Sequence, residues 1–341
     1  QFLKILCIPS KHWGWSCIVI GVGCLLQSLV KQNYSNIEII LINDGSFDGT
    51  EVKCAEWASV DPRIIVVHQE NKGPVITRIK GLSIAKGDYV TFVDSDDFIH
   101  PQMYELLMSI FIKEDVEIVQ CGVCDVYENN NKLLFKHRKT ENTLNDYKIY
   151  TKKEGVLNIL DDSDWQSYMW NKIYKKNILE GINWPIGRGL DEDTSVMYEI
   201  FQKAMNSAYL YRELYYYRHR ENSICTAKGS IKLAKNIYDR CEARWEKYLF
   251  TVNHPEYSSI LNKMKNIYLS VSLSSLRFII IHKSLFPQNY EKIILDRIKR
   301  EKVLSITFLP DLFSRLKRIE LFMVRHCFIL YKFSIRIVSR L

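Results

Sequence analysis

The sequence lacks internal repeats, low-complexity tracts and a regular pattern of cysteines. Its nine cysteines are odd in number and irregularly spaced, which argues against a disulfide framework and favours a reducing compartment. The apolar run at residues 17–26 is shorter than the roughly 20 residues that a membrane-spanning helix needs, so we expect a buried helix or strand there rather than a signal peptide. Apolar residues make up 47% of the chain, which excludes a mostly disordered protein.

One close pair of cysteines, Cys121 and Cys124, lies in a segment typical of a β-strand. Their odd spacing puts the two side chains on opposite faces of a sheet. A second cysteine pair that would complete a zinc site is missing from the sequence. We therefore predict two buried structural thiols rather than a metal or redox site.

The charge is unevenly distributed. The whole chain of 341 residues has 47 basic and 39 acidic side chains, a net charge of +8. Residues 1–230 hold 26 basic and 30 acidic side chains, a net of −4, whereas residues 231–341 hold 21 and 9, a net of +12. The basic character is therefore a property of the C-terminal third alone.

Short β-branched runs alternate with helical patterns between about residues 25 and 124. Strands are predicted at residues 37–42, 64–68, 89–93 and 116–121, separated by helices at 48–59, 75–85 and 101–112. This alternation is typical of parallel βαβ units, in which ligands bind beyond the carboxyl ends of the strands. Polar turns follow two of these strands, at Asp44 and at residues 94–97, so both should lie at one edge of the sheet. Residues 128–153 are predicted to form a loop or a β excursion.

Three carboxylates within four residues, in Asp94-Ser95-Asp96-Asp97, are the most informative feature. Such a cluster repels itself unless a cation lies between the carboxylates. Mg²⁺ characteristically takes one or two protein carboxylates together with substrate phosphates. A solvated acidic turn is the alternative that this cluster alone leaves open.

Several motifs together resemble those of the family 2 glycosyltransferases of GT-A fold. The first has the form N-D-G-S-x-D-G and spans residues 43–49; the second is a helix after Asn71 and Gly73; the third is G-D-Y-x-x-F-x-D-S-D-D at residues 87–97. Further resemblances are Trp170-Asn171-Lys172, the Glu192-Asp193 pair, and the segment from Tyr215 to Ser223. The resemblance covers about two thirds of the chain. It implies an α/β nucleotide-sugar-binding sheet flanked by helices, over residues 1–230, with a helical extension over residues 231–341.

This resemblance implies a role for each matched residue. A Mg²⁺ or Mn²⁺ ion would be held against the donor diphosphate by Asp94, Asp96 and Asp97. The residues assigned to donor binding are Asp44, Arg78, Asp94, Ser95, Arg218 and His219. For Asp44 the alternative is a turn or helix cap, and for Arg78 it is an ordinary surface arginine.

The acceptor hydroxyl must lose a proton as it attacks the sugar, and Asp193 is the general base that the resemblance implies. Trp170, Asn171, Lys172 and Glu192 are assigned to the acceptor side. An acidic first helical turn is the alternative for Glu192 and Asp193, and core packing is the alternative for the tryptophans. Members of the family invert the configuration of the transferred sugar.

Residues 1–23 depart from the family pattern. The family's first strand ends in P-x-Y-N, and counting back from Asp44 places that end near residues 14–17, where Gly-Trp-Ser-Cys stands. Ile8-Pro9 has the proline but comes too early in the chain and lacks the Tyr-Asn. A missing strand end would weaken nucleotide binding, so an inactive glycan- or partner-binding relative is the second hypothesis. A nucleotidyltransferase is the third, although the Glu192-Asp193 pair argues against it.

The basic tail is rich in apolar residues that are interrupted by charge. Residues 311–341 hold 7 basic and 2 acidic side chains. This composition favours amphipathic helices that lie on an anionic membrane, and it carries no recognised nucleic-acid-binding module. We therefore predict a cytoplasmic enzyme at the inner face of the plasma membrane, acting on a nucleotide sugar, in particular a UDP-sugar, and on a cell-surface polysaccharide or lipid-linked acceptor.

Overall fold

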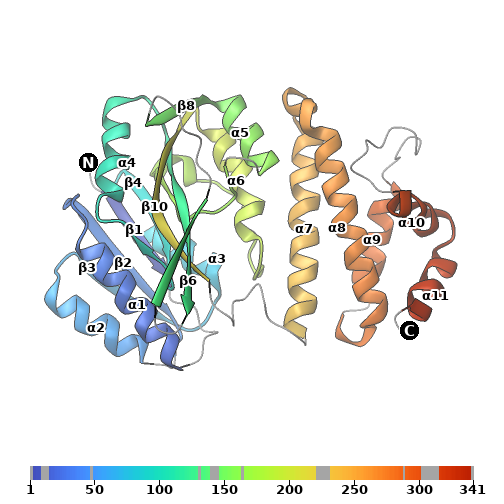
Figure 1. Ribbon diagram of the computed structural model, residues 1–341, viewed down its shortest axis with the longest axis horizontal. Coiled ribbons are helices and arrows are strands. Elements are labelled where there is room, and N and C mark those ends of the chain that lie inside the picture. The colour runs from blue at the N-terminus through green and yellow to red at the C-terminus, as the bar shows by residue number, and fades with distance from the viewer. Residues whose placement is uncertain are drawn as a thin grey trace. The chain divides into compact units, whose positions relative to one another are not determined.

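The computed structural model describes residues 3–8, 15–46, 49–129, 132–138, 146–162, 165–219, 231–286, 289–300 and 315–338 (Figure 1). The chain forms two compact units. The first comprises Gln1–Arg188 and Val196–Thr226, and the second comprises Gly189–Ser195 and Ala227–Leu341. The protein is thus a mixed α/β chain with a central sheet and a helical C-terminal region, as the sequence predicts.

The first unit is built on a ten-stranded sheet with helices packed against it. Its strands are β1 (Leu3–Ile8), β2 (Ile37–Asp44), β3 (Ile64–Gln69), β4 (Tyr89–Asp94), β5 (Phe98–Ile99), β6 (Ile118–Asn129), β7 (Lys132–His137), β8 (Tyr147–Thr151), β9 (Lys172–Lys175) and β10 (Asn206–His219). Its helices are α1 (Trp15–Val30), α2 (Thr50–Val60), α3 (Pro74–Ile84), α4 (Met103–Lys113), α5 (Lys152–Asp161) and α6 (Glu192–Lys203), the last of which begins in the second unit.

The strand order is β3-β2-β1-β4-β9-β6-β10-β5, with β7 paired to β6 and β8 paired to β10. Strands β3, β2, β1 and β4 are parallel, as the βαβ pattern predicts. The short β9 runs antiparallel between β4 and β6, so β6 points in the same direction as β4 without touching it. Strand β10 is parallel to β6, and therefore the carboxyl ends of β2, β4, β6 and β10 lie at one edge. The β excursion predicted at residues 128–153 is confirmed by β7 and β8.

The prediction that the first strand ends near residues 14–17 is wrong. Strand β1 ends at Ile8 and pairs on both sides, so that Cys7 lies opposite Leu41 and Ile8 lies opposite Asp94. Trp15 already belongs to α1, and this 16-residue helix takes up the length between the first two strands. The apolar run is therefore a helix, and Leu25, Leu26 and Leu29 are buried on it. Residues 9–14, which include Pro9, lie outside the described residues.

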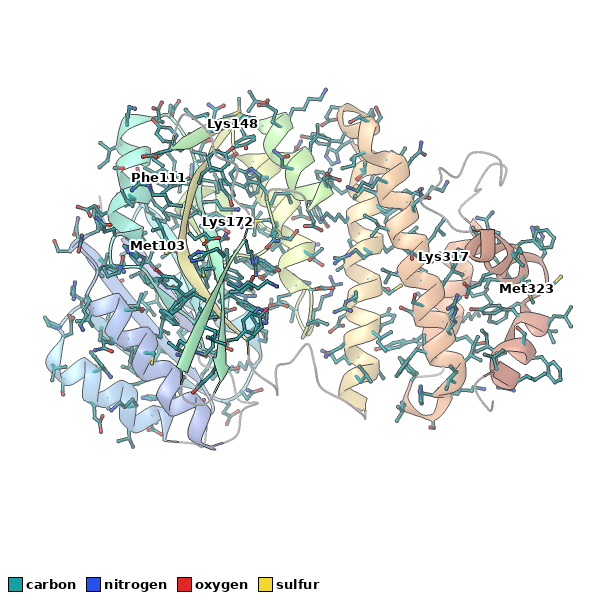
Figure 2. The ribbon with its side chains drawn as sticks, in the orientation of Figure 1. Met103, Phe111, Lys148, Lys172, Lys317 and Met323 are labelled. Carbon is teal, nitrogen blue, oxygen red and sulfur yellow. The ribbon has the colours of Figure 1, made fainter. Side chains whose placement is uncertain are left out.

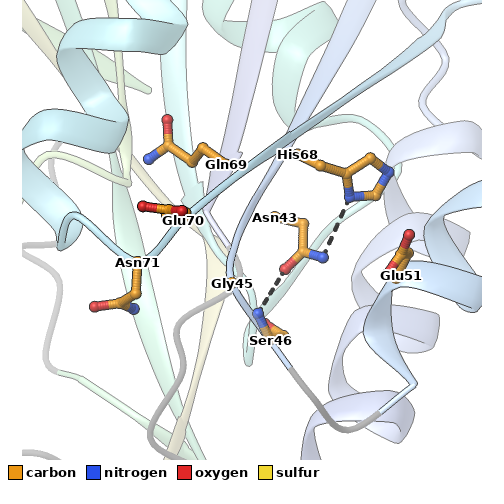
Figure 3. A pocket seen from close by; sticks show the side chains of 8 residues that line it. All are labelled: Asn43, Gly45, Ser46, Glu51, His68, Gln69, Glu70 and Asn71. Carbon is orange, nitrogen blue, oxygen red and sulfur yellow. Dashed lines mark hydrogen bonds between the residues drawn. The ribbon is translucent and has the colours of Figure 1, made fainter.

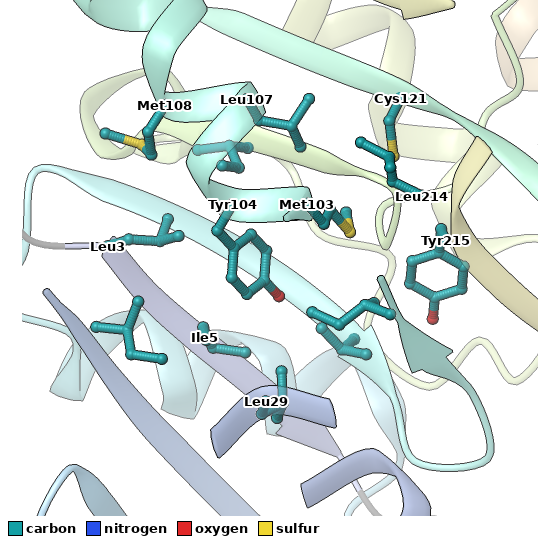
Figure 4. Close-up of a cluster of buried hydrophobic side chains, with 14 of the residues drawn as sticks. Leu3, Ile5, Leu29, Met103, Tyr104, Leu107, Met108, Cys121, Leu214 and Tyr215 are labelled. Carbon is teal, nitrogen blue, oxygen red and sulfur yellow. The ribbon is translucent and has the colours of Figure 1, made fainter. Parts of the chain in front are cut away.

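The core of the first unit joins α1, α4, β1, β6 and β10 (Figure 4). Leu3 and Ile5 of β1 are fully buried in it, together with Tyr104 and Leu107 of α4. Cys121 and Cys124 are both buried, as predicted, and Cys121 lies in this cluster. A sheet whose central strands are covered on both faces fixes the position of the strand ends, and the polar residues that follow them are thereby held in place.

The second unit is helical. It contains α7 (Ile231–Asn253), α8 (Leu261–Ile281), α9 (Tyr290–Arg300), α10 (Arg315–His326) and α11 (Phe328–Val338). Helices α7 and α8 run side by side, and α9, α10 and α11 pack against α8 or each other (Figure 1). Ion pairs between helices, such as Arg297 with Glu242 and Arg277 with Glu320, connect them. One described helical stretch, Pro255–Ile281, has the length and composition of a membrane span; 56% of its most apolar 18-residue window is buried, as in the core helix of a bundle.

Candidate functional site

Two aspartates mark the carboxyl edge of the parallel strands. Asp44 ends β2 and Asp94 ends β4, and β1 lies between these two strands. Two strand spacings of about 4.8 Å separate them, a gap of roughly 10 Å. The predicted gathering of the two polar turns at one edge is therefore confirmed.

The Asp44 carboxylate is engaged within the protein. It is 2% exposed, and its Oδ1 accepts hydrogen bonds from Gln69 Nε2 and Lys72 N, both at 2.8 Å. Its Oδ2 accepts from Gly73 N at 2.9 Å. Asp44 thus fixes the loop that leads into α3, as the turn alternative describes, and its assignment to donor binding stays a prediction.

The following loop is held just as closely. Gly45 has φ +72°, and a Cβ there would lie 2.9 Å from Asn71 N, so a larger residue does not fit. Asn71 Nδ2 in turn donates to the Asp44 carbonyl oxygen at 2.9 Å. The N-D-G-S turn and the Asn71–Gly73 loop therefore form one hydrogen-bonded structure.

The acidic motif separates into two kinds of carboxylate. Asp94 and Asp96 are half-buried, whereas Asp97 is 0% exposed and Ser95 is buried. The Asp97 Oδ2 accepts from the Tyr215 hydroxyl at 2.7 Å, and its Oδ1 accepts from Arg218 N at 2.8 Å. Asp97 therefore anchors β10 through both of its oxygens, and its assignment as a metal ligand stays a prediction.

Burial raises the pKa of Asp97 well above its usual value, and the neighbouring negative charges of Asp96 and Asp94 raise it further. The two remaining carboxylates, Asp94 and Asp96, are partly exposed to solvent, and their oxygen atoms are potential metal ligands. Such a pair fits a hard divalent cation, which prefers oxygen and keeps several positions for water or phosphate.

A polar pocket of about 690 Å³ opens beyond the ends of β2 and β3 (Figure 3). Asn43 lies at its centre, where its Nδ2 contacts His68 Nδ1 at 3.3 Å and its Oδ1 accepts from Ser46 N at 3.0 Å. The residues that line it are Asn43, Gly45, Ser46, Glu51, His68, Gln69, Glu70 and Asn71. Its amide, imidazole and carboxylate groups suit a ligand with many hydrogen-bonding atoms and no large apolar surface.

The two arginines assigned to donor binding are both buried. Arg78 lies on α3 with 5% exposure, so it is not the ordinary surface arginine that we considered. Arg218 is 7% exposed, and its guanidinium lies 5.7 Å from the centre of the Phe98 ring. The Arg218 Nε has no hydrogen-bond partner among the described residues. Arg220 and Ser223 lie outside the described part of the chain.

His219 is held by a neighbouring carboxylate. Its Nε2 contacts Asp125 Oδ1 at 2.7 Å, and its ring stacks on Tyr127 with centroids 4.3 Å apart. Arg138 binds the same Asp125 through two nitrogens, at 2.7 and 2.6 Å. Burial acts to raise the pKa of Asp125, yet the hydrogen bonds from Arg138 and His219 outweigh it and lower the pKa. His219 thus belongs to a network at the ends of β6 and β10.

The Trp170-Asn171-Lys172 segment is internal. Trp170 is 4% exposed and stacks between Tyr168 and Tyr215. Lys172, labelled in Figure 2, is fully buried, and its Nζ donates to Gln166 O, Tyr168 O and Asn171 Oδ1 at 3.0, 2.6 and 2.8 Å. Asn171 Nδ2 donates to Cys121 O at 2.9 Å.

These three side chains therefore hold β9 between β4 and β6. All three are buried, which favours core packing for Trp170, and their assignment to the acceptor side stays a prediction. Trp165 is likewise fully buried, which favours core packing over sugar stacking.

Glu192 and Asp193 lie in the first turn of α6, within the second unit. Both are half-buried. The loop before them is fixed to α7, since Gly189 N donates to Asp239 Oδ2 at 2.9 Å and Arg240 Nε contacts Asp191 Oδ2 at 3.4 Å. Asp191 has a positive φ of 56°, which turns the chain sharply before the helix. An acidic pair at a helix start is favourable, and the neighbouring loop fixes its position.

Comparison with known proteins agrees with these features. The model of the family described as Glycosyl transferase family 2 matches residues 23–178. Residues 23–178 are therefore similar to glycosyltransferase family 2. Glycosyltransferase GlyA of Streptococcus pneumoniae is 32% identical over 203 residues, which are 58% of this chain and 29% of that protein. Putative glycosyltransferase EpsH of Bacillus subtilis is 31% identical over 203 residues, 58% of this chain and 57% of that protein.

Solved structures show the same fold. The structure of S. aureus TarS 1-349 in complex with UDP-GlcNAc has a TM-score of 0.66 and 18% identity to this chain, covering 100% of it and 92% of that chain. A second structure of S. aureus TarS 1-349 has a TM-score of 0.63 at 16% identity and covers 100% of this chain and 91% of that chain. The chain spans 29% and 57% of the two curated relatives above.

Proposed function

We propose that this protein is a family 2 glycosyltransferase that transfers a sugar from a UDP-sugar to a cell-surface polysaccharide or a lipid-linked glycan, with a divalent metal ion and with inversion at the anomeric carbon. The observation that carries the proposal is the half-buried pair Asp94 and Asp96 at the carboxyl end of β4, on the same sheet edge as the polar pocket. The UDP-GlcNAc complex of the TarS structure supports a UDP-sugar as donor. A relative described as a minor teichoic acid biosynthesis protein supports a cell-surface acceptor.

In this proposal the nucleoside occupies the pocket around Asn43, and the diphosphate extends across β1 towards Asp94 and Asp96. When bound, Mg²⁺ or Mn²⁺ supplies Lewis-acid neutralisation of the leaving diphosphate. The protein contributes two carboxylates whose positions are fixed by the anchored Asp97. The buried Arg218 brings positive charge to the same edge.

The acceptor hydroxyl attacks the anomeric carbon from the face opposite the diphosphate. Asp193 takes the hydroxyl proton as the new glycosidic bond forms and the bond to the diphosphate oxygen breaks. Hydrogen bonds hold the loop before α6 within the second unit, as this role needs, because a general base must keep one position to act in the transition state.

The test is a transfer assay with a panel of UDP-sugars and Mn²⁺, in which release of UDP and labelling of the acceptor are measured. Turnover should disappear with EDTA and fall by about 100-fold or more in Asp96→Ala and Asp193→Ala. Asp115→Ala is the matched control, since its carboxylate is 95% exposed in the first unit. Donor binding without turnover would instead support an inactive relative, and release of pyrophosphate would support a nucleotidyltransferase.

We further propose that the second unit holds the enzyme at the anionic cytoplasmic face of a membrane. On α11, Ile329 is 84% exposed and Phe333 is 65% exposed, while Tyr331 is buried on the opposite face. Ile337 continues the apolar stripe one turn later. Residues 315–338 hold six basic side chains and one acidic, a net of +5, so the surface combines exposed apolar groups with positive charge.

A further inference from the structure

A second cluster of metal-ligand atoms lies outside the acidic motif. Cys124 of β6, His137 of β7 and Glu213 of β10 bring one thiol, one imidazole and one carboxylate together, with their ligand atoms all within 4.8 Å of one another. In the sequence, only the two cysteines of β6 indicate a possible metal site, and they face opposite sides of the sheet. The fold brings a histidine and a glutamate from two other strands next to Cys124.

Strand pairing fixes the first two members. Cys124 and His137 are direct partners in the antiparallel ladder between β6 and β7, so their side chains emerge on one face. Cys124 is fully buried, whereas the His137 side chain is 76% exposed. The cluster therefore has a protected side and a side that solvent and metal ions can reach.

An irregularity in β10 supplies the third member. The register between β10 and β6 shifts on both sides of Glu213, which leaves Glu213 opposite Gly122, two positions before Cys124 and on the same face. A Cβ on Gly122 would lie 3.3 Å from Glu213 Cγ, so the glycine leaves room for the glutamate. Bulges commonly redirect a side chain in this way.

The Glu213 carboxylate has an unused acceptor. Its side chain is only 10% exposed, and its Oε2 contacts His137 Nδ1. Its Oε1 is buried and has no hydrogen-bond partner among the described residues. A buried carboxylate oxygen without a partner is costly, and a cation beside it would remove that cost.

We propose that Cys124, His137 and Glu213 form a binding site for a borderline-soft divalent metal ion, Zn²⁺ in the first place, distinct from the ion at Asp94 and Asp96. Sulfur, nitrogen and carboxylate oxygen are the ordinary ligands of zinc, which binds them at about 2.0–2.3 Å. A thiolate ligand selects against Mg²⁺ and Mn²⁺. Three protein ligands leave the fourth position to water on the exposed side.

Binding replaces the thiol proton by the metal ion. Burial raises the pKa of Cys124, as do the negative charges of Glu213 and Asp125, so the thiol is neutral without the ion. On binding, the Sγ–H bond breaks, the proton leaves to solvent and Sγ bonds the metal. The ion would link β6, β7 and β10 close to the end of β10, which carries Arg218.

The test uses the full chain, stripped with EDTA and titrated with Zn²⁺ against a chromogenic chelator, and with Co²⁺ as a spectroscopic substitute. We expect one Zn²⁺ per chain at this site and a thiolate-to-Co²⁺ charge-transfer band. Both should persist in Cys121→Ser, a buried cysteine on the opposite face of the same strand, and in Asp96→Ala. Both should be lost in Cys124→Ser, with Zn²⁺ affinity lower by on the order of 100-fold.

His137→Gln is a second test of the site that misfolding should not affect, because this exposed side chain can be replaced without disturbing the core. It should weaken Zn²⁺ binding, and the rise in the unfolding temperature that Zn²⁺ gives the wild type should shrink. Absence of Zn²⁺ binding in the wild type would overturn the proposal and leave His137 and Glu213 as an ion pair only. Equal binding in the wild type, Cys124→Ser and His137→Gln would also overturn it. Neither result bears on the transfer assay above.

Discussion

The Tyr215 hydroxyl joins the two ends of the acidic motif. It donates to Asp97 Oδ2 at 2.7 Å and accepts from Asp94 N at 3.2 Å. Tyr215 is fully buried and lies 118 residues away from Asp97 in the chain. A single group on β10 thus fixes the turn that presents Asp94 and Asp96 to solvent.

Tyr215→Phe should loosen this turn. The substitution keeps the ring, which stacks on Trp170 with centroids 4.2 Å apart, and removes only the hydroxyl. It leaves a buried Asp97 oxygen and the Asp94 N–H without their partner, so the free energy of unfolding should fall by about 1–3 kcal/mol. Thermal unfolding measures the loss, and the Mn²⁺ concentration needed for half-maximal transfer should rise.

Tyr216→Phe provides the matched control. Tyr216 is the next residue on β10 and stacks on Phe98 with centroids 4.8 Å apart. Loss of this half-buried hydroxyl should leave both measurements close to the wild type. Equal effects of the two substitutions would show that the bridging hydroxyl has no special role.

Asp96→Asn and Asp97→Asn should differ in kind. Asp96→Asn removes a half-buried carboxylate of the proposed metal site, so the Mn²⁺ requirement should rise while the unfolding temperature changes little. Asp97→Asn replaces one of the two accepting oxygens with an amide NH₂, which cannot accept, so stability should fall by about 1–3 kcal/mol. Metal activation curves and thermal unfolding, measured on both variants, separate the two roles. If only Asp97→Asn shifted the metal activation curve, Asp97 would be the metal ligand and not Asp96.

Lys172→Met should destabilise the first unit strongly. The buried ammonium holds three acceptors at the start of β9, and the methionine would leave them without a donor. A loss of about 3 kcal/mol is expected, measured by denaturant unfolding. Lys175→Met, on the same strand but 32% exposed in its side chain, should cost at most about 1 kcal/mol. Similar losses in both variants would contradict the internal role of Lys172.

The double substitution Ile329→Glu and Phe333→Glu should weaken binding to vesicles that contain anionic lipid. Removing two large apolar groups from the contact lowers the affinity by on the order of 100-fold, and the added negative charge weakens it further. The measurement is co-sedimentation with anionic and with neutral vesicles. Val60→Glu with Ile186→Glu, two exposed apolar positions of the first unit, is the matched control. If the double substitution abolished self-association and left lipid binding unchanged, this face would bind a second copy of the chain and not a membrane.

Local sequence patterns were enough to predict the parallel strands and the edge at which they end. The βαβ alternation and the polar turns at Asp44 and Asp94 depend on neighbours in the chain, and the structure confirms both. The end of β1 was misplaced because the apolar stretch after it can form a strand or a helix, and only pairing with β2 and β4 decides between them.

The individual side chains at the site depend on distant partners. Asp96 and Asp97 are adjacent and chemically identical, yet Tyr215 and Arg218 bury one and leave the other accessible. No local sequence pattern predicts that Lys172 is buried. Only the folded chain places three acceptors around its amine. The same limit applies to Glu213, whose position next to Cys124 follows from an irregular register that no local pattern predicts.

The pair of Asp61 and Arg63 should make stability depend on acid pH. Arg63 binds the Asp61 carboxylate through Nε and Nη2, and its Nη2 also donates to Val30 O at the end of α1, at 3.0 Å. The hydrogen bond from Arg63 is the main cause that lowers the pKa of Asp61, more than burial raises it. A lowered pKa in the folded state means that the stabilisation is present above the ordinary aspartate pKa of about 3.9 and is lost as the pH falls through the folded value.

Asp61→Asn should therefore be less stable than the wild type by about 1–3 kcal/mol at neutral pH, because the charged hydrogen bonds are lost. Below about pH 4 the gap should narrow as the wild-type carboxylate becomes protonated. Unfolding temperatures measured between neutral and acid pH test this convergence. Glu56→Gln is the control, since its carboxylate is 57% exposed and pairs only with Lys53 among the described residues, so its gap to the wild type should be small throughout. A gap for Asp61→Asn that stays constant with pH would mean that packing, and not the charge of Asp61, joins α1 to β3.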